Sequence, residues 1–218
     1  QKTLREVSRL SFSNQGQICL CGSRILVQSG IYDRFKNDLI QKAENIKIGD
    51  PMEDGTQFGS LISEDHFHKV MNYIDLAKQE GGICLTGGER KLLEGRCKNG
   101  YFLKPTIFEG LGPECRTNME EIFGPVITLQ KFETEAEAIH LANASDYGLA
   151  ATLWTQDLTR AHRLASEINT GIVWINCWLN RDLRTPFGGM NQSGVGREGG
   201  WDAMRFFTEA KNVCIQFD

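Results

Sequence analysis

The chain has 218 residues, of which 40% are hydrophobic, and this supplies enough apolar material for a well-buried core. Its 24 basic and 28 acidic side chains give a formal net charge of −4, and no block of Lys and Arg is present to follow a phosphate backbone, so we expect no nucleic-acid partner. No apolar run approaches the ~20 residues that cross a bilayer, which predicts a soluble protein without a membrane partner.

The cysteines indicate the compartment. There are seven, an odd number, scattered along the chain without the spacing of a disulfide framework. This favours a reducing compartment, and we expect a cytoplasmic protein. The first residues, QKTLREVSRL, have no apolar core of the secretory type and no initiator Met. We therefore expect that further sequence precedes Gln1.

The predicted elements alternate between two periodicities. Alternating or continuously apolar stretches predict strands in four places: 23–28, 127–132, 149–155 and 171–176. Apolar residues at helical spacing predict helices that follow or precede them: 31–46, 68–79, 134–144 and 161–168. Polar and Gly-rich stretches predict loops: 49–60, 87–101 and 184–200. Short strands that alternate with amphipathic helices are typical of an α/β fold, doubly wound, with a mostly parallel sheet and helices on both faces.

The end of the chain is predicted to form a separate strand. NVCIQF (212–217) alternates apolar and polar residues, and no helical segment follows it. A lone strand needs a sheet edge to pair with. We therefore divide the chain into one domain at 1–210 and a terminal strand at 211–218 that bridges subunits.

The segment NQGQICLCGSR (14–24) contains a candidate nucleophile, Cys19. Gly16 and Gly22 permit sharp turns that allow backbone N–H groups to face a reacting atom, and such positive potential favours a thiolate. A single Cys in a Gly-containing turn is also consistent with a buried structural thiol. The local pattern by itself does not choose between the two.

Three motifs in a fixed order resolve this choice. NQGQIC (14–19) with GSR (22–24), EEIFGPV (120–126) and PFGG (186–189) together resemble the aldehyde dehydrogenase superfamily over nearly the whole chain. The resemblance also covers IGDP, YGLAA and SGVGREGG. It implies that residues 1–210 are the catalytic domain of such an enzyme, and that the half that binds the nucleotide lies upstream.

The resemblance implies a role for Cys19 in catalysis. In this family the thiol at its position, and not at that of Cys21, attacks the aldehyde. A thiohemiacetal forms, hydride passes to the nicotinamide of NAD or NADP, and the thioester is hydrolysed. The backbone N–H of Cys19 would stabilise the oxyanion in part. The family's second oxyanion donor, an Asn, and the Glu that activates water would lie upstream.

The resemblance also implies three cofactor contacts. Glu121 matches the acid that accepts hydrogen bonds from the nicotinamide ribose, and Phe123 matches the aromatic residue beside the nicotinamide. A helix-terminal acid and a core Phe are the structural alternatives. Lys69 matches a Lys that contacts ribose, although a solvated helix Lys is an equal alternative. NAD and NADP are not distinguished, because the upstream half reads that difference.

The stretch 176–189, NCWLNRDLRTPFGG, is the candidate substrate loop. Trp178 and Phe187 are expected to wall an apolar pocket, and Arg181 is suited to bind a carboxylate through two parallel hydrogen bonds. The pattern resembles the branch of the family that oxidises 2-hydroxy- or 2-aminomuconate semialdehyde. A surface pair between Arg181 and Asp182 is the alternative.

Two further patterns have interpretations that their context does not favour. GVGREG (194–199) satisfies the G-x-G-x-x-G pattern but follows a polar loop and not a buried strand, so we do not expect a phosphate-binding turn. Cys19-x-Cys21 lacks further ligands at zinc spacing, so no metal is expected.

Two functional alternatives stay open: a catalytically silent fragment that serves folding or assembly, and transfer of the acyl group to coenzyme A. The full-length enzyme is expected to be a homodimer or homotetramer that acts on a small aldehyde.

Overall fold

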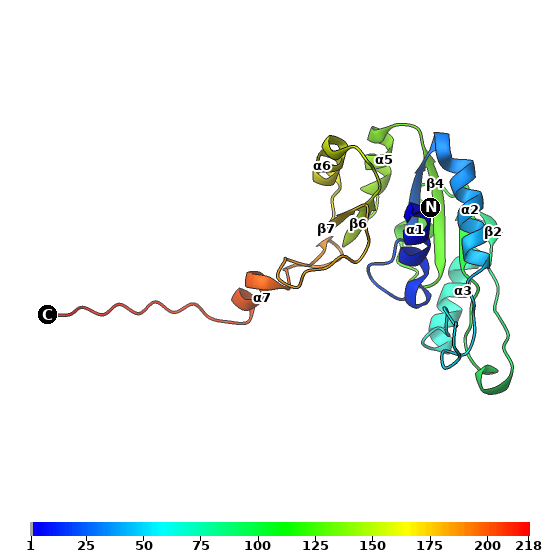
Figure 1. Ribbon diagram of the computed structural model, residues 1–218, viewed down its shortest axis with the longest axis horizontal. Helices are drawn as coiled ribbons and strands as arrows, with labels where there is room; N and C mark the ends of the chain where they lie inside the picture. The colour runs from blue at the N-terminus through cyan, green and yellow to red at the C-terminus, as the bar shows by residue number, and fades with distance from the viewer. Residues whose placement is uncertain (1) are drawn as a thin grey trace.

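The main sheet of the protein has four strands in the order β1-β4-β3-β2. The computed structural model describes residues 2–218 and is shown in Figure 1. The strands are β1 (Arg24–Gln28), β2 (Ile83–Thr86), β3 (Thr106–Glu109) and β4 (Val126–Phe132). β4 is parallel to both β1 and β3, whereas β2 pairs with β3 in the antiparallel sense. The expected mostly parallel α/β sheet is confirmed.

Helices cover both faces of this sheet. They are α1 (Lys2–Phe12), α2 (Tyr32–Glu44), α3 (Glu64–Gln79), α4 (Arg116–Met119) and α5 (Glu135–Ala142). On one face, α1 and α2 bury Leu10 and Leu39 in a cluster with Ile127 of β4. On the other face, α3 buries Ile74 in a second cluster with Phe108 of β3. Neighbouring strand residues point to opposite faces, so the two clusters make the chain doubly wound.

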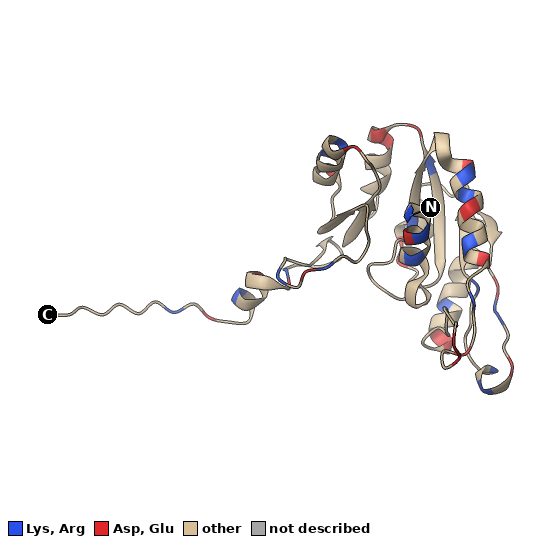
Figure 2. Ribbon diagram, viewed as in Figure 1, with Lys and Arg blue, Asp and Glu red and all other residues tan. Residues whose placement is uncertain are grey.

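The helices begin where the sequence provides capping side chains. The Ser63 hydroxyl accepts a hydrogen bond from the His66 N–H at 3.2 Å and starts α3 four residues before the apolar periodicity of 68–79. Thr134 caps α5 in the same way. On α2 the outward face carries alternating acidic and basic side chains, as Figure 2 shows. These features explain why the predicted helices agree with the structure.

A second group of elements stands beside the main sheet. Strands β6 (Ala150–Leu153) and β7 (Ile172–Ile175) form their own parallel pair, and α6 (Leu158–Glu167) connects them. The short strands β5 (Tyr147–Gly148) and β8 (Met190–Asn191) form an antiparallel pair, and α7 (Gly200–Phe206) follows. Within residues 2–218, neither pair is hydrogen-bonded to the main sheet. A single continuous sheet is therefore not present.

Several segments differ from the sequence-based expectation, strand β3 and the end of the chain among them. Strand β3, which lies between β2 and β4, was not predicted, and its four residues are mostly buried on both faces. The terminal segment 212–217 was predicted as a strand, but residues 209–218 carry no regular secondary structure in the single chain. A strand needs a partner for its backbone groups, and the segment contacts none here. No helix within the described residues is long and apolar enough to cross a membrane.

Candidate active site

The thiol loop, residues 13–22, connects α1 to β1. It opens with the 3-10 turn η1 (Ser13–Gly16), in which Asn14, Gln15 and Gly16 have φ of 49°, 58° and 70°. Three successive left-handed residues reverse the chain directly after α1. The Asn14 amide then donates to the Gln17 carbonyl at 3.1 Å and stabilises the reversal.

Cys19 lies on the tight turn that follows. The Cys21 N–H donates to the Ile18 carbonyl at 2.9 Å, which places Cys19 and Leu20 at the tip of the turn. The Cys19 side chain is exposed. Its backbone N–H takes part in no hydrogen bond within residues 2–218. A free thiol and a free donor N–H therefore occur on the same residue.

The thiol loop contacts the EEIFGPV segment, more than a hundred residues away in the sequence. A Cβ on Gly16 would lie 2.1 Å from the carbonyl oxygen of Gly124. Only glycine permits this approach, and its φ of +70° is also the conformation that favours glycine. The neighbouring Phe123 has a left-handed φ of 59°. NQGQIC and EEIFGPV, two motifs far apart in the sequence, are thus in direct contact.

Helix α3 holds the EEIFGPV segment from the other side. The Lys69 ammonium donates to the backbone carbonyl of Glu121 at 3.0 Å. His66, one turn earlier, lies with Nε2 2.6 Å from the Phe123 carbonyl. A carbonyl only accepts, so this nitrogen carries the proton. Sequence reasoning missed His66, whose only signal is its position three residues before Lys69 on the same helix face.

One cleft of about 1780 Å³ brings Cys19, Glu121 and Phe123 together. Glu121 is exposed, and within the described part of the chain its carboxylate accepts no hydrogen bond. Lys69 lies outside this cleft and lines a separate hollow of about 680 Å³. Three of the predicted site residues thus line one cleft, whereas Lys69, which is also exposed, contacts the backbone of Glu121 from outside that cleft.

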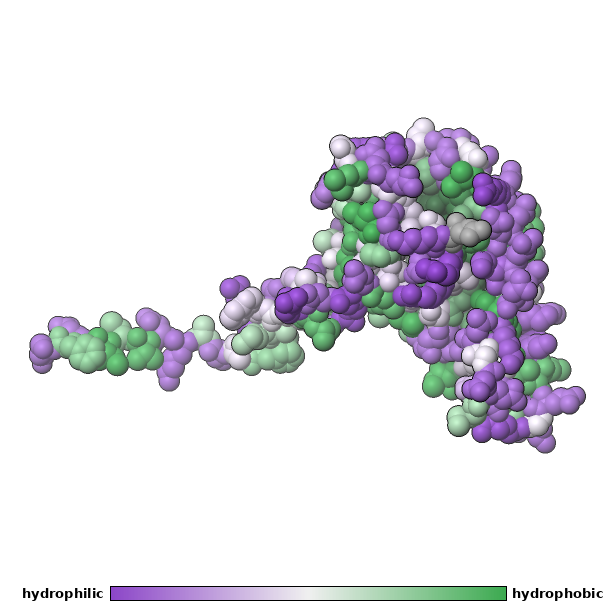
Figure 3. Space-filling model, in the orientation of Figure 1, coloured by the Kyte–Doolittle hydropathy of each residue, from purple (hydrophilic) through white to green (hydrophobic). Residues whose placement is uncertain are grey.

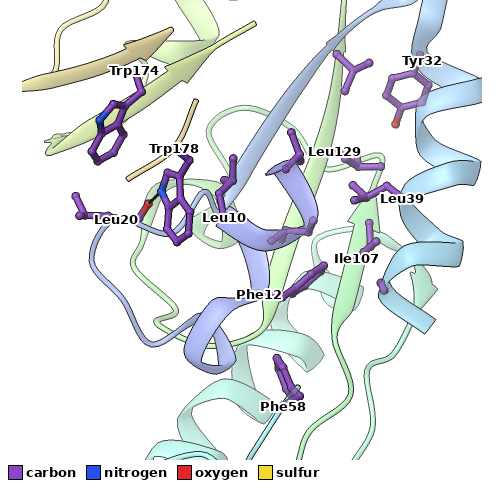
Figure 4. Close-up of a cluster of buried hydrophobic side chains, with 14 residues drawn as sticks. Leu10, Phe12, Leu20, Tyr32, Leu39, Phe58, Ile107, Leu129, Trp174 and Trp178 are labelled. Carbon is purple, nitrogen blue, oxygen red and sulfur yellow. Dashed lines mark hydrogen bonds between the residues drawn. The ribbon is translucent and has the colours of Figure 1, made fainter. Parts of the chain in front are cut away.

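Trp178 lies behind the thiol loop and not on the wall of the cleft. Its side chain is 4% exposed, and its indole N–H donates to the Leu20 carbonyl at 2.9 Å. Figure 4 shows this ring beside Leu20 within the buried cluster. The Arg9 guanidinium stacks over the ring at 5.1 Å and donates to the Trp178 carbonyl. Trp178 thus supports the backbone of Leu20, the residue after Cys19.

The substrate-loop residues Arg181 and Phe187 form a unit of their own. The Arg181 guanidinium lies 4.1 Å from the centre of the Phe187 ring, with Nη2 3.8 Å from a Glu198 carboxylate oxygen. The Phe187 and Glu198 backbones exchange two hydrogen bonds of 2.7 and 2.8 Å. Arg184 instead pairs with Asp182 and lowers the pKa of that carboxyl. Arg181 and Phe187 do not line the cleft that holds Cys19.

Cys21 differs from Cys19 in its environment. Burial raises the pKa of the Cys21 thiol from 9.0 to about 11, with a smaller contribution from the nearby Cys19. At pH 8 this reduces its thiolate fraction by about 100-fold relative to an ordinary thiol. We expect iodoacetamide at pH 8 to label Cys19 well before Cys21, with labelling of Cys21 increasing only as the pH approaches 11. Peptide mass spectrometry checks this, and equal rates at both thiols would contradict it.

The chain matches the aldehyde dehydrogenase family over residues 1–213. It belongs to that family. It is 44% identical over its whole length to 2-aminomuconic 6-semialdehyde dehydrogenase of Pseudomonas sp. and covers 44% of that protein. It is also 44% identical, over 215 residues, to 2-hydroxymuconic semialdehyde dehydrogenase of Pseudomonas sp. strain CF600 and again covers 44% of it.

Solved aldehyde dehydrogenase structures share the fold. A NAD+ complex of aldehyde dehydrogenase from Bacillus cereus superposes with a TM-score of 0.93 at 39% identity, covering the whole of this chain and 43% of the other. Betaine aldehyde dehydrogenase from Staphylococcus aureus, also in complex with NAD+, gives a TM-score of 0.91 at 39% identity, covering 94% of this chain and 41% of the other. The chain therefore spans less than half the length of the aldehyde dehydrogenases that it matches.

Proposed function

We propose that this chain supplies the thiol-bearing half of an aldehyde dehydrogenase that oxidises a carboxylate-bearing semialdehyde, such as 2-hydroxy- or 2-aminomuconate semialdehyde, with NAD or NADP. The observation that carries the proposal is the cleft shared by Cys19, Glu121 and Phe123. The two relatives named for muconic semialdehydes support the substrate class. In the full-length enzyme that we propose, this chain is joined to the portion that the relatives carry beyond the matched region.

Cys19 begins the reaction. Its thiolate adds to the aldehyde carbon, and the carbonyl oxygen of the aldehyde becomes the oxyanion of the tetrahedral thiohemiacetal adduct. The free N–H of Cys19 is placed on the same residue as the attacking sulfur and donates to that oxygen. Removal of one such donor costs on the order of 2.7–4 kcal/mol in other enzymes. After oxidation, water hydrolyses the thioester and restores the thiol.

The EEIFGPV segment fits the cofactor. When bound, NAD or NADP supplies the acceptor for the two electrons. The unpaired carboxylate of Glu121 can accept two hydrogen bonds from vicinal ribose hydroxyls. The partly buried Phe123 offers an apolar surface at the same cleft. Lys69 and His66 hold the carbonyls of these two residues and orient them, so that Lys69 acts through Glu121.

Arg181 is proposed to bind the substrate carboxylate from the loop 176–189, which lies outside the lining of the cleft that holds Cys19. Stacking on Phe187 orients the Arg181 guanidinium. The distance of 3.8 Å between Arg181 and the Glu198 carboxylate is longer than a charge-assisted hydrogen bond, so the carboxylate of a ligand can replace Glu198. We expect Arg181→Ala in the full-length enzyme to raise KM at least about tenfold for a carboxylate-bearing aldehyde and less than about twofold for a neutral one. Steady-state kinetics on both substrates checks this, with Arg184→Ala as the control because Asp182 already pairs with Arg184. Equal effects on both substrates would contradict the assignment.

A second candidate function is assembly, and the end of the chain favours it. Val213, Ile215 and Phe217 are exposed by 69, 67 and 86%, and Figure 3 shows this apolar segment extending away from the rest of the molecule. An extended segment with alternating apolar side chains is suited to join a sheet of another subunit. On this alternative, residues 211–218 bridge the subunits of a homodimer or homotetramer, and the 218-residue chain has no activity of its own.

A nicotinamide assay tests the enzymatic candidate. The 218-residue chain and the full-length enzyme are each mixed with NAD and a semialdehyde, and reduced nicotinamide is followed by its absorbance. We expect turnover from the full-length enzyme and none from the chain alone. Absence of turnover from a folded full-length enzyme, with NADP and with coenzyme A as further additions, would overturn the enzymatic proposal.

A further inference from the structure

One stripe of polar side chains on helix α3 contacts the segment 116–123, which contains most of EEIFGPV. The stripe consists of His66, Lys69, Tyr73 and Glu80, the last of which is the C-cap residue of the helix. Spacings of three, four and seven residues place these side chains on one helix face. His66 and Lys69 contact the carbonyls of cofactor-site residues. Tyr73 and Glu80 contact the residues that come just before them.

Glu80 fixes the start of α4, the short helix that leads into EEIFGPV. Its carboxylate accepts hydrogen bonds from the Arg116 N–H at 2.8 Å and from the Thr117 N–H at 3.2 Å. The Thr117 hydroxyl donates to the same carboxylate at 2.6 Å. Burial opposes the ionisation of Glu80, but these hydrogen bonds outweigh it and lower its pKa. An anion on α3 thus satisfies the first N–H groups of α4.

The carboxylate of Glu120, at the other end of α4, is fully engaged. The Tyr73 hydroxyl donates to Oε2 at 2.7 Å, and the Arg116 guanidinium donates to both carboxylate oxygens at 2.7 and 3.0 Å. The hydrogen bond from Arg116 lowers the pKa of Glu120. Burial, together with the bond to Glu120, raises the pKa of Tyr73 to about 12, so the hydroxyl keeps its proton and remains the donor. Glu120 is therefore clamped between α3 and α4.

The two successive glutamates of EEIFGPV differ in their surroundings. Glu120 and Glu121 both line the cleft that contains Cys19. The side chain of Glu121 is exposed, and its carboxylate accepts no hydrogen bond from any residue between 2 and 218. The carboxylate of Glu120 is already bound to two side chains. Of the two, only Glu121 has a carboxylate that is free to bind a ligand.

A free carboxylate needs a fixed backbone if it is to meet two vicinal hydroxyls at once, because a hydrogen bond weakens steeply below an angle of about 120°. The Lys69 ammonium holds the Glu121 carbonyl at 3.0 Å, but one hydrogen bond fixes a point and not an orientation. The Cα atoms of neighbouring residues lie about 3.8 Å apart. The clamp on Glu120 therefore supplies a second fixed point directly beside Glu121.

We infer that Glu120 and Tyr73 are positioning residues, which orient the neighbouring Glu121 toward the ribose hydroxyls of the nicotinamide cofactor. Tyr73 and Arg116 hold the Glu120 carboxylate, and Glu80 holds the start of the same short helix. The inference rests on the proposed function, in which Glu121 accepts hydrogen bonds from ribose. Neither Glu120 nor Tyr73 touches the cofactor in this arrangement, and both act through Glu121.

Isothermal titration of the full-length enzyme with NAD, or with NADP where NAD gives no heat, tests the inference without any aldehyde. Glu121→Gln is expected to raise the Kd at least about tenfold, because a charged acceptor is lost. Glu120→Ala is expected to raise it about three- to tenfold, and Tyr73→Phe about two- to fivefold. In the Glu121→Gln background, Glu120→Ala is expected to change the Kd less than about 1.5-fold, because it acts through the carboxylate already removed. Glu120→Gln, which keeps an oxygen for the Tyr73 hydroxyl, is expected to recover part of the affinity lost in Glu120→Ala.

The chain contains a matched control for the clamp. The Tyr32 hydroxyl donates to the Glu109 carboxylate at 3.0 Å, and the Lys36 ammonium donates to both oxygens of that carboxylate at 3.2 and 2.9 Å. Neither Tyr32 nor Glu109 is among the residues that line the cleft. Tyr32→Phe and Glu109→Ala are therefore expected to lower the urea midpoint as the clamp variants do, but to leave the Kd within about 1.5-fold of the wild type.

A second measurement uses the 218-residue chain without cofactor. NMR relaxation of the Glu121 amide is expected to give an order parameter near 0.85 in the wild type and below about 0.6 in Glu120→Ala, whereas Glu109→Ala keeps the wild-type value. A Glu121 amide that is already flexible in the wild-type chain would overturn the inference. Where Glu120→Ala does not fold, Tyr73→Phe, which removes one hydroxyl, is measured in its place, and an unchanged order parameter counts against the clamp.

The binding results separate this inference from the proposed function. If Glu121→Gln leaves the Kd unchanged, the cofactor contact of the proposed function fails, and the positioning role fails with it. If Glu121→Gln weakens binding but Glu120→Ala does not, only the positioning role is overturned. The same holds if the effects of the two substitutions multiply in the double variant, or if Glu109→Ala weakens binding as much as Glu120→Ala does.

Discussion

Cys19→Ser in the full-length enzyme is expected to lower kcat for aldehyde oxidation on the order of 10⁴-fold or more. A serine hydroxyl is far less acidic than a thiol and needs an adjacent base to act as a nucleophile. Within residues 2–218, no His or carboxylate makes a hydrogen bond or ion pair with Cys19. The variant keeps the size and the turn of the loop, so the effect is expected in kcat and not in the free energy of unfolding.

The adjacent thiol provides the control. Cys21 is partly buried, and its sulfur lies 3.7 Å from the Ser13 carbonyl oxygen, which it contacts as a donor. Cys21→Ser is expected to change kcat less than about threefold, because this side chain points into the structure and its raised pKa keeps it protonated. Initial rates of reduced nicotinamide formation measure both variants. Wild-type turnover in Cys19→Ser, or equal losses in the two variants, would remove Cys19 from the mechanism.

Gly16→Ala is expected to lower the free energy of unfolding of the 218-residue chain by about 3 to 4 kcal/mol, an amount typical of a backbone clash combined with left-handed strain. The new Cβ would lie 2.1 Å from the Gly124 carbonyl oxygen and 2.9 Å from the Pro125 nitrogen, both backbone atoms that cannot rotate away. Relief requires the thiol loop and the EEIFGPV segment to separate. Urea unfolding measures the loss.

Substitutions at two other glycines distinguish the cost of the left-handed backbone conformation from the cost of the steric clash. Gly95 has a φ of +63° and no atom within 4 Å of the position that a Cβ would take, so Gly95→Ala reports the left-handed conformation alone and is expected to cost about 1 kcal/mol. Gly112 has neither a positive φ nor a neighbour within 4 Å, and Gly112→Ala is expected to change stability by less than about 0.5 kcal/mol. If Gly16→Ala and Gly95→Ala lose the same amount, the close approach of the two motifs does not contribute to stability.

Local pattern was enough to predict much of the fold. The helical spacing of 31–46 and the alternation of 23–28 appear in the structure as α2 and β1, and the α/β class follows from their repetition. Strand β3 was not predicted from the sequence, because three of its four residues are buried and it therefore shows no alternation of apolar and polar residues. Strand β2 was not predicted either, and its antiparallel direction depends on the partner strand and not on the sequence of β2 itself.

Family motifs selected Cys19, Glu121 and Phe123, and the structure brings these residues to one cleft. Other residues could not be placed in this way. Trp178 has the composition of a pocket wall, but the packing of α1 buries it behind Leu20. His66 carries no motif signal, because its role is to hold the Phe123 carbonyl of a segment 57 residues away.

The sequence by itself determined the periodicity of the longer elements and the positions of several turns, because these depend on interactions between near neighbours in the chain. Only the tertiary structure decided that Gly16 meets Gly124, that His66 holds the Phe123 carbonyl, and that Trp178 lies behind Leu20. Such contacts depend on which elements pack together, and the energy of packing is shared among many residues that are far apart in the sequence.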